Sequence, residues 1–541
     1  MHLHLHSYYT MLESAASIDA LVEKAVAYNL KSIALTDKNG MYGLIRFAKR
    51  AIEAGIKPVL GAVIDDPSAE EINAVLIAKN NQGYSDLCKI ITVRKLNEDF
   101  SLIDLIKSKP ENLIVISSSV KLISAIEPYP DFYIELVVTK RNKTEARKLY
   151  QIAVNRGFNF VASNPVFFIE PNDFELHKLL CAIRLNSTID ELNESDLQDK
   201  EFYFKSPDEM KIIFRKIPEA ISSAERILDK CNVDLKLGEY KYPKYELPDN
   251  SPAYELLRYI AYEGLHKRYK KVTDVEINRL EYELSVITEM SFVDYVLIVW
   301  DLVKEARRRG MVTIGRGSAA NSIVSYCLGL TDVDPIKHNL YFERFLNKGR
   351  STPPDVDIDF SWKERDEMIK YIFDKYGYEN VAMISTTVTF RARSAFRETA
   401  KAFGISDNEI SRYSKFIPWT NAANLPNISS LFPESKTLNF EIEPWKSIIR
   451  LASRIADFPR HLSIHPGGLV ITPKPITNYT ALEYAKNKGL GLIITQPDMY
   501  SIEDLGLIKI DILSQRSLGV LRDTIESIKN SKLKSRKSEK P

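Results

Sequence analysis

Hydrophobic and polar positions alternate in short units over residues 1–205. Residues 2–6 alternate polar and apolar side chains as a strand does, and residues 18–28 carry apolar side chains at helical spacing. Further apolar runs typical of buried strands lie at residues 32–36, 74–78, 112–118, 132–138 and 158–163. Strands that alternate with helices predict an α/β domain here, with a parallel sheet or a barrel.

The pattern changes along the rest of the chain and predicts further parts. Residues 173–232 have helical spacing, and residues 238–252 contain three prolines and three tyrosines, as a linker would. We divide the chain into an α/β domain, a helical connector with the linker, a mixed segment, a helical insertion, a second mixed segment and a basic tail, at residues 1–205, 206–250, 251–387, 388–463, 464–513 and 514–541. Within the tail, residues 530–541 are predicted to be disordered.

Acidic and apolar residues alternate in the sequence PDVDIDF at 354–360. On a strand, Asp355, Asp357 and Asp359 share one face, while Val356 and Ile358 point to the other. Three like charges on one face repel unless cations neutralise them, and grouped carboxylates suit Mg²⁺. The alternative is a solvated edge strand whose charges prevent aggregation.

Two other short patterns carry candidate chemistry. GRGS at 315–318 lies between a strand-like run and an apolar helix, so its glycines and Arg316 fit phosphate binding; an ordinary turn with a serine cap is the alternative. In a later apolar run, Lys509 and Asp511 share a face by the same period-two rule. A surface pair is the simpler interpretation of these two unless their strand lies beside the acidic one.

Composition limits the possibilities without choosing among them. Hydrophobic residues make up 45% and charged residues 27% of the 541-residue chain, as in globular proteins with a substantial core. The net charge of +2 neither supports nor excludes nucleic-acid binding. Four scattered cysteines without a CxxC pair indicate a reducing cytoplasm, and without a long apolar run we expect no membrane association.

These patterns together resemble the alpha subunit of bacterial DNA polymerase III, a C-family replicative polymerase, over essentially the whole chain. The residues that carry the resemblance are FVDY at 292–295, GRGS at 315–318, FERFLN at 342–347, PDVDIDF at 354–360, HPGG at 465–468 and KID at 509–511. The resemblance implies a nucleotidyltransferase-type palm at 251–387 and 464–513, with a helical thumb at 388–463 inserted between its two parts. It also implies an enzyme, a DNA-directed DNA polymerase.

The same resemblance assigns roles to individual residues. It implies that Asp355, Asp357 and Asp511 are the catalytic carboxylates and hold two Mg²⁺ ions, with Asp359 as a supporting neighbour. The incoming deoxynucleoside triphosphate would be bound by Gly315, Arg316, Gly317, Ser318, Arg344 and Lys509. In the thumb, the residues expected to contact DNA phosphates are Arg391, Arg393, Arg397 and Lys401, which helical spacing allows to share a face. A solvated basic helix face is the alternative.

The first 205 residues resemble the polymerase and histidinol phosphatase domain, a β/α barrel that in some members holds three metal ions. His4, His6 and Asp37 match ligands of that site. The other aligned positions carry residues that bind metal poorly or not at all, namely Lys38, Val63, Asn73, Thr139, Pro165 and Phe167. We therefore expect a degenerate, empty metal site and a structural domain.

The family also has fingers, a clamp-binding module and an oligonucleotide-binding fold, which the sequence does not contain after Asp511. The expected partners are primed template DNA, deoxynucleoside triphosphates, other replicase subunits and a second chain that carries the fingers and clamp-binding module. Alone, the chain is expected to bind primed DNA but to extend it poorly. The competing hypotheses are a non-catalytic DNA-binding or assembly fragment and a metal-dependent phosphoesterase.

Overall fold

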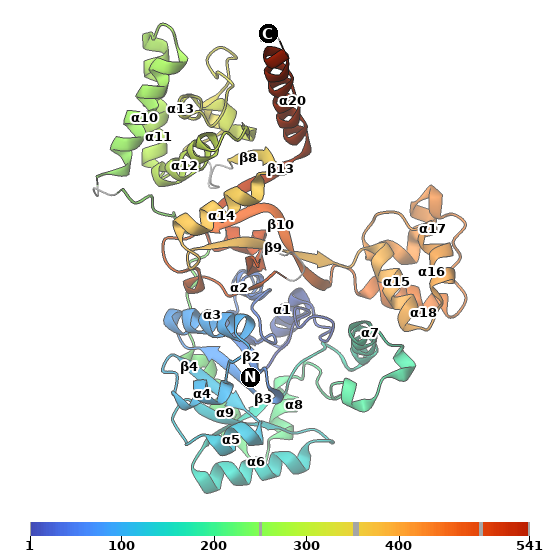
Figure 1. The fold of residues 1–541 in the computed structure, drawn as a ribbon. Coiled ribbons are helices and arrows are strands. Elements are labelled where there is room, and N and C mark those ends of the chain that lie inside the picture. Colours follow the sequence, from blue (N-terminus) through green and yellow to red (C-terminus); the bar gives the residue numbers. More distant parts are fainter. Residues whose placement is uncertain (1, 248–250, 350–355, 486–490, 539–541) are drawn as a thin grey trace.

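The computed structural model describes residues 2–247, 251–349, 356–485 and 491–538, with side chains described as far as Ser531. In this part of the chain the strands form two sheets. Figure 1 shows the first sheet and its helices at one end, the second sheet in the centre, and two helical groups beyond it, α10–α13 and α15–α18. The expected mixed α/β architecture is confirmed.

The first sheet has six strands in chain order. Its strands are β1 (Ser32–Leu35), β2 (Lys57–Asp66), β3 (Ala69–Ala78), β4 (Leu113–Ser117), β5 (Phe132–Val137) and β6 (Asn159–Ser163). The sheet is not all parallel, because β3 runs antiparallel to both β2 and β4. Of the two expected arrangements, the all-parallel sheet was wrong, since β2, which contains Pro58 and ends in two aspartates, was not recognised as a strand; a curled, barrel-like sheet fits the other.

Backbone hydrogen bonds of the N-terminal segment connect the two edges of this sheet. Thr36, which follows β1, donates to the Leu5 carbonyl at 2.8 Å, and Leu5 forms a parallel bridge with Val166, which follows β6. The sheet therefore curls so that its outer strands meet at one short segment. His4 and His6 flank the buried Leu5 and lie on the opposite side from its side chain.

Helices cover the first sheet and continue beyond it. They are α1 (Ile18–Ala27), α2 (Leu44–Glu53), α3 (Asn81–Leu96), α4 (Leu102–Lys107), α5 (Val120–Ala125), α6 (Lys143–Arg156), α7 (Phe174–Leu185), α8 (Pro207–Ile213) and α9 (Pro218–Lys230). The last three confirm the helical interpretation of residues 173–232. Proline or serine at their starts explains why α8 and α9 begin where they do.

The second sheet has the order β11-β12-β9-β10-β13-β8-β7. Its strands are β7 (Thr313–Arg316), β8 (Asp357–Ser361), β9 (Val381–Thr389), β10 (Pro459–Ile471), β11 (Leu482–Tyr484), β12 (Ile493–Asp498) and β13 (Lys509–Gln515). Helices α10 (Ala253–Arg268), α11 (Asp274–Glu289), α12 (Val293–Arg308), α13 (Ile323–Leu328) and α14 (Arg365–Tyr376) share one apolar core with this sheet. The acidic strand β8 is thus an inner strand, next to the edge strand β7.

A helical insertion separates the paired strands β9 and β10. It contains α15 (Ala392–Ala402), α16 (Asp407–Ser414), α17 (Ile428–Leu431) and α18 (Trp445–Arg454), which form a separate group in Figure 1. The ring of Phe396 stacks on that of Trp445 at 5.8 Å between centroids, inside a cluster of four aromatic side chains. The helical pattern at 388–463 is confirmed, except that the two strands occupy its ends.

The C-terminal tail differs from the expectation of disorder. Helix α20 (Arg516–Ser538) extends through most of residues 530–541, the last three of which lie outside the described residues. Lysine, arginine and leucine are good helix formers, and no proline occurs between Pro497 and Pro541. No helix within the described ranges is long and apolar enough to cross a membrane.

The first domain and the second sheet share a buried polar junction. Gln496 on β12 is fully buried, and its Oε1 accepts a hydrogen bond from the Met41 backbone N–H at 2.9 Å. Its Nε2 donates to Glu483 Oε2 at 3.2 Å, which also accepts from the Tyr42 hydroxyl. Burial without these bonds would be costly, so Gln496 holds the two parts in one arrangement.

We therefore expect Gln496→Met to destabilise the protein by about 1–3 kcal/mol, because the Met41 N–H loses its acceptor at nearly unchanged side-chain volume. The measurement is the thermal unfolding midpoint of the variant against the unmodified chain. Gln82→Met, at an exposed position of α3, is the matched control and should leave the midpoint unchanged. An equal midpoint for both variants would contradict this role of Gln496.

Candidate functional sites

Two acidic strands lie side by side in the second sheet. Strand β13 pairs with β8 in parallel, and the register places Asp511 opposite Asp357 and Leu513 opposite Asp359. The alternating residues Ile358, Ile510 and Ile512 are buried in the core on the other face. Asp357, Asp359 and Asp511 therefore share one face, as the period-two pattern predicted. Asp355 lies outside the described residues.

Two cations from neighbouring positions compensate these carboxylates. In β7, which is antiparallel to β8, Arg316 lies opposite Asp357, and its Nε is 3.7 Å from Asp357 Oδ2 and 3.2 Å from Asp359 Oδ1. Lys509 Nζ lies 2.9 Å from Asp511 Oδ2. Residues predicted from three separate sequence patterns thus meet on one face of one sheet.

The carboxylates retain binding capacity for a metal ion. Oδ1 of Asp511 and Oδ1 of Asp359 are buried and accept no hydrogen bond from a described residue, although His465 Nδ1 and Arg316 Nε lie 3.7 and 3.2 Å from them, respectively. Buried carboxylate oxygens without hydrogen bonds, on a rigid sheet, are suitable ligands for Mg²⁺, which prefers one or two carboxylates and fills its other positions with water or phosphate. The described residues contain no group of three or more His, Cys, Asp or Glu side chains placed to hold an ion, and Asp355 is not among them.

The HPGG segment forms the other border of Asp511. Gly468 lies opposite Asp511 in the antiparallel pair β10–β13. A Cβ atom at Gly468 would lie 3.2 Å from Asp511 Oδ1 and 2.6 Å from His465 Nδ1. His465 Nδ1 accepts the Gly468 N–H at 2.6 Å, which fixes the imidazole beside the carboxylate. Only glycine lets the backbone approach Asp511 this closely.

Arg365 supports this border, and sequence reasoning did not identify it. Its Nε donates to the Ile512 carbonyl at 3.0 Å and its Nη2 to the Pro466 carbonyl at 2.6 Å. The guanidinium thus joins β13 to the HPGG segment from α14, five residues beyond the acidic pattern. No local signal reveals this, because both acceptors are backbone carbonyls far along the chain.

The glycine-rich turn lies at the end of β7. Gly317 has a φ of +76°, a conformation that favours glycine, and a Cβ at Gly315 would lie 1.9 Å from the Leu330 carbonyl oxygen. Ser318 follows in a short 3-10 helix (Gly317–Asn321), which packs against the 3-10 helix that ends at the exposed Arg344. Five of the six proposed phosphate-binding residues therefore lie on the acidic strands or the turn beside them, and Arg344 lies on a 3-10 helix that packs against this turn.

The ion pair Arg279–Glu283 fixes the glycine-rich turn through contacts with Asn321 and Ser322. The sequence did not predict this pair. Glu283 on α11 is fully buried; its Oε2 accepts the Ser322 hydroxyl at 2.6 Å and its Oε1 pairs with Arg279 at 2.7 Å. Burial raises the pKa of the Glu283 carboxyl against these contacts. Arg279 also donates to the Asn321 and Leu340 carbonyls, which ties the turn to the segment that leads to Arg344.

The four basic residues of the helical insertion make contacts within the protein. Arg393 donates two hydrogen bonds to the Ile417 carbonyl, and Arg391 pairs with Asp457 at 2.9 Å. Arg397 and Lys401 lie 3.8 and 3.7 Å from one carboxylate, Asp407. Three of the four thus share a side of α15, but that side faces α16 and Ile417. The side chains of Arg391 and Lys401 are nearly half exposed.

In the N-terminal domain, His4 and His6 line one cavity of about 190 Å³ together with Lys38, Val63, Asn73, Pro165 and Phe167. The two rings lie 4.9 Å apart, and burial lowers the pKa of His6 well below its usual value. Asp37 is buried, and its carboxylate accepts hydrogen bonds from Ser7 and Thr10; burial raises its pKa to about 7. The Thr139 hydroxyl donates a hydrogen bond to Asp199, and Thr139 does not line this cavity.

The ammonium group of Lys38 lies beside the cavity. Lys38 Nζ lies 2.9 Å from Glu70 and 3.3 Å from Asp65, whose other oxygen pairs with Arg94. His4 Nδ1 lies 2.7 Å from the buried Glu135, a partner that sequence reasoning missed. Burial opposes the charged form of Glu135, but His4 and two serine hydroxyls hold its pKa below the usual range. The carboxylates around His4 and His6 therefore already have cationic or hydrogen-bonded partners.

Comparison with known proteins gives two family matches. Residues 255–514 match the bacterial DNA polymerase III alpha NTPase domain, and residues 2–158 match the PHP domain. The chain is 35% identical to DNA polymerase III subunit alpha of Bacillus subtilis over 98% of its length, and 34% identical to that of Borreliella burgdorferi. It is 32% identical to an error-prone DNA polymerase of Symbiobacterium thermophilum.

The alignments cover a much larger fraction of this chain than of its relatives. Each of these alignments includes 98% of the present chain but only 49–52% of the relative. The chain therefore spans about half the length of the curated relatives it matches. The match at residues 255–514 contains the described acidic face, and the match at residues 2–158 contains most of the lining of the N-terminal cavity.

For the N-terminal cavity we expect Lys38→His to raise the affinity for Zn²⁺ by about tenfold, since an ammonium group repels the ion and an imidazole can bind it. Zn²⁺ titration with a competing chelator measures the affinity. Lys121→His replaces an exposed, ion-paired lysine outside this cavity and is the matched control. If the unmodified chain binds Zn²⁺ stoichiometrically and as tightly as Lys38→His, the domain is not a degenerate metal site.

Proposed function

The chain belongs to the family of bacterial DNA polymerase III alpha subunits, and we propose that it provides the catalytic centre for template-directed transfer of deoxynucleotides to a DNA primer. The single observation that carries this proposal is the register that places Asp357 beside Asp511 on adjacent strands. Carboxylates in this arrangement, bordered by Arg316 and Lys509, suit the chemistry of a nucleoside triphosphate bound with metal ions.

We assign the second sheet to the palm and the helical insertion to the thumb. The palm would comprise residues 251–387 and 464–513, and the thumb residues 388–463. Two features support this division. The acidic face belongs to strands on both sides of the insertion, and the insertion leaves and returns through the paired strands β9 and β10.

In this proposal Asp357 and Asp511 hold two Mg²⁺ ions together with Asp355, and Asp359 supports them. When bound, the ions would lower the pKa of the primer 3′-hydroxyl and neutralise the triphosphate. The chain's own contribution is orientation. HPGG and Arg365 fix Asp511, and the backbone hydrogen bonds of β8 and β13 fix its distance from Asp357.

Arg316 and Lys509 have a second role in this scheme. Without substrate they neutralise the aspartates. With metal ions bound at the aspartates, the charges of Arg316 and Lys509 would be available to the triphosphate, Arg316 as a planar, forked donor and Lys509 as a compact one. Gly315, Gly317 and Ser318 let the backbone come close to the phosphates, and Arg344 extends the basic surface outward.

For DNA we propose phosphate contacts by Arg391 and Lys401, two exposed members of the basic group whose side chains each pair with a carboxylate. Arg393 and Arg397 would act mainly by fixing α15 to its neighbours, given their contacts with the Ile417 carbonyl and Ser414. The ligands implied are primed template DNA and deoxynucleoside triphosphates, and the relatives' name, DNA polymerase III subunit alpha, supports association with other replicase subunits. No specific observation favours phosphoesterase chemistry at His4 and His6.

The proposal is tested by deoxynucleotide incorporation on a primed template in Mg²⁺, assayed with the assembly that contains this chain. Incorporation directed by the template base, lost on chelation of the metal, is the expected result. Assemblies that bind primed DNA but incorporate nothing, while a relative under the same conditions does, would favour a non-catalytic DNA-binding role.

We expect Asp511→Asn to reduce incorporation by at least about a hundredfold, since it removes a metal ligand's charge at constant volume. The matched control is Asp374→Asn, an exposed carboxylate on α14, which should retain full activity. Single-turnover incorporation rates compare the two. Equal rates for Asp511→Asn and the control would disprove the assignment of Asp511.

For the thumb, we expect Lys401→Ala to weaken binding of primed DNA at all sequences and to lower the slope of log affinity against log salt by about one, as loss of one phosphate contact should. Fluorescence anisotropy at several salt concentrations measures both. Lys415→Ala, on the same insertion beyond α16, tests whether any lysine has this effect. An unchanged slope for Lys401→Ala would leave the basic group with a structural role.

A further inference from the structure

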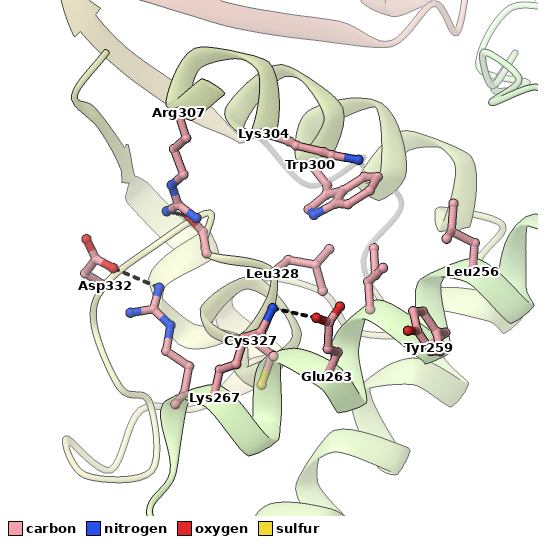
Figure 2. Close-up of a pocket in the computed structure, with 14 residues that line it drawn as sticks. Leu256, Tyr259, Glu263, Lys267, Trp300, Lys304, Arg307, Cys327, Leu328 and Asp332 are labelled. Carbon is pink, nitrogen blue, oxygen red and sulfur yellow. Dashed lines mark hydrogen bonds and ion pairs between the residues drawn. The ribbon is translucent and has the colours of Figure 1, made fainter. Parts of the chain in front are cut away.

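A cavity of about 690 Å³ lies between α10, α12 and the end of α13. Figure 2 shows its lining, with α10 below, α12 above and Leu328 between them. None of the residues assigned to the triphosphate or the metal ions is among its lining residues. Its volume is within the range of sites that hold a small organic ligand.

Two glycines allow a close approach between elements that line the cavity. A Cβ at Gly264 on α10 would lie 2.1 Å from the Cys327 carbonyl oxygen, so glycine lets α10 touch α13 at this point. Gly329 ends α13 with a φ of +76°, and a Cβ there would lie 2.1 Å from Arg307 Nη1. Arg307 donates a hydrogen bond to the Gly329 carbonyl, which fixes its guanidinium beside the end of α13.

The lining carries an excess of positive charge. Two cations are paired with lining acids, Lys267 with Glu263 at 2.5 Å and Arg268 with Asp332 at 2.8 Å. Lys304 and Arg307 make no ion pair with any residue in the described ranges; the contacts of Arg307 go to a carbonyl. This leaves an excess of two positive charges around one cavity, which favours an anionic ligand.

Aromatic rings lie next to these cations. Lys304 Nζ is 4.6 Å from the centroid of the Trp300 ring, and Tyr259 is 68% exposed on the facing helix. Figure 2 shows Trp300 on the upper helix and Tyr259 on the lower one, with Leu328 to the left of Tyr259 and Leu256 at the right edge of the cavity. Exposed rings beside lysine and arginine are the combination that binds a base together with its phosphate.

We propose that this cavity is a second nucleotide-binding site, separate from the acidic face, which holds one nucleotide unit with its base between Tyr259 and Trp300 and its phosphate at Lys304 and Arg307. The unit is either a free nucleotide or part of single-stranded DNA, since both offer the same base and phosphate. The walls are helices whose backbone groups are bonded internally, so an extended peptide finds no strand edge to pair with. The proposal does not depend on polymerase activity.

The site lies close to the glycine-rich turn. Leu330, the residue after Gly329, is the one whose carbonyl oxygen Gly315 approaches. A nucleotide bound next to Gly329 would therefore be adjacent in sequence to Leu330, which contacts the glycine-rich turn. It would nevertheless require no metal ion, because no carboxylate of the lining is left without a cation.

The experiment is a binding titration of the full chain in EDTA, once with dATP and once with a short oligothymidylate. EDTA removes the metal ions on which triphosphate binding at the acidic face should depend. Equilibrium dialysis measures the affinity, and quenching of tryptophan fluorescence that disappears in Trp300→Phe assigns the signal. Lys304→Glu and Tyr259→Ala change exposed side chains, and equal thermal unfolding midpoints would show that both variants fold.

We expect each variant to weaken binding by about tenfold, while Lys107→Glu, an exposed lysine of the first domain, changes nothing. Binding of dATP alone would identify free nucleotide as the ligand, and binding of the oligonucleotide alone would identify single-stranded DNA; both support the site. Absence of binding for both, or binding that neither variant weakens, would overturn it. Lys304-dependent binding of a Glu-rich peptide in place of nucleotides would also overturn it, in favour of a protein-docking site.

Discussion

The constraint on which the acidic centre depends is the repulsion among carboxylates that share one face of a sheet. Asp357, Asp359 and Asp511 are brought together by strand register, so neighbouring cations have to offset the repulsion among them. Arg316 and Lys509 supply that compensation from the neighbouring positions. A site that needs neutralising cations when empty is also one that can exchange them for metal ions and a triphosphate.

The surrounding structure can be understood as support for this face. Gly468 and His465 border Asp511 on one side, and Arg365 ties their segment to β13. On the other side the buried pair Arg279–Glu283 holds the glycine-rich turn. The remote parts are attached firmly as well. Gln496 joins the first domain to the second sheet, and Arg450 of the insertion pairs with Glu175 of α7 at 2.6 Å.

The sequence predicted features that depend on local periodicity, and it failed where distant partners decide. Alternation alone placed Asp357 and Asp359 on one face and Lys509 beside Asp511, and the alternation of strands and helices was recognised. The resemblance assigned Asp357 and Asp511 to one metal site and so predicted that their strands lie together, which the pairing of β8 with β13 confirms. The role of Arg365 was missed because its acceptors lie far away in the chain. Helical spacing put Arg397 and Lys401 on one side of α15, but only the fold shows that Asp407 faces them. Strand β2 was missed because Pro58 argued against a strand. The helical tail was missed because its high charge suggested disorder.

The central claim is that Asp357 and Asp511 bind metal ions together with the triphosphate. It is tested most directly by anomalous diffraction from crystals grown with Mn²⁺ and a non-hydrolysable deoxynucleoside triphosphate. The account predicts an anomalous peak in contact with both carboxylates, with the guanidinium of Arg316 and the ammonium of Lys509 turned from the aspartates toward the phosphates. Mn²⁺ bound only elsewhere, with Arg316 and Lys509 still paired to the aspartates, would contradict it.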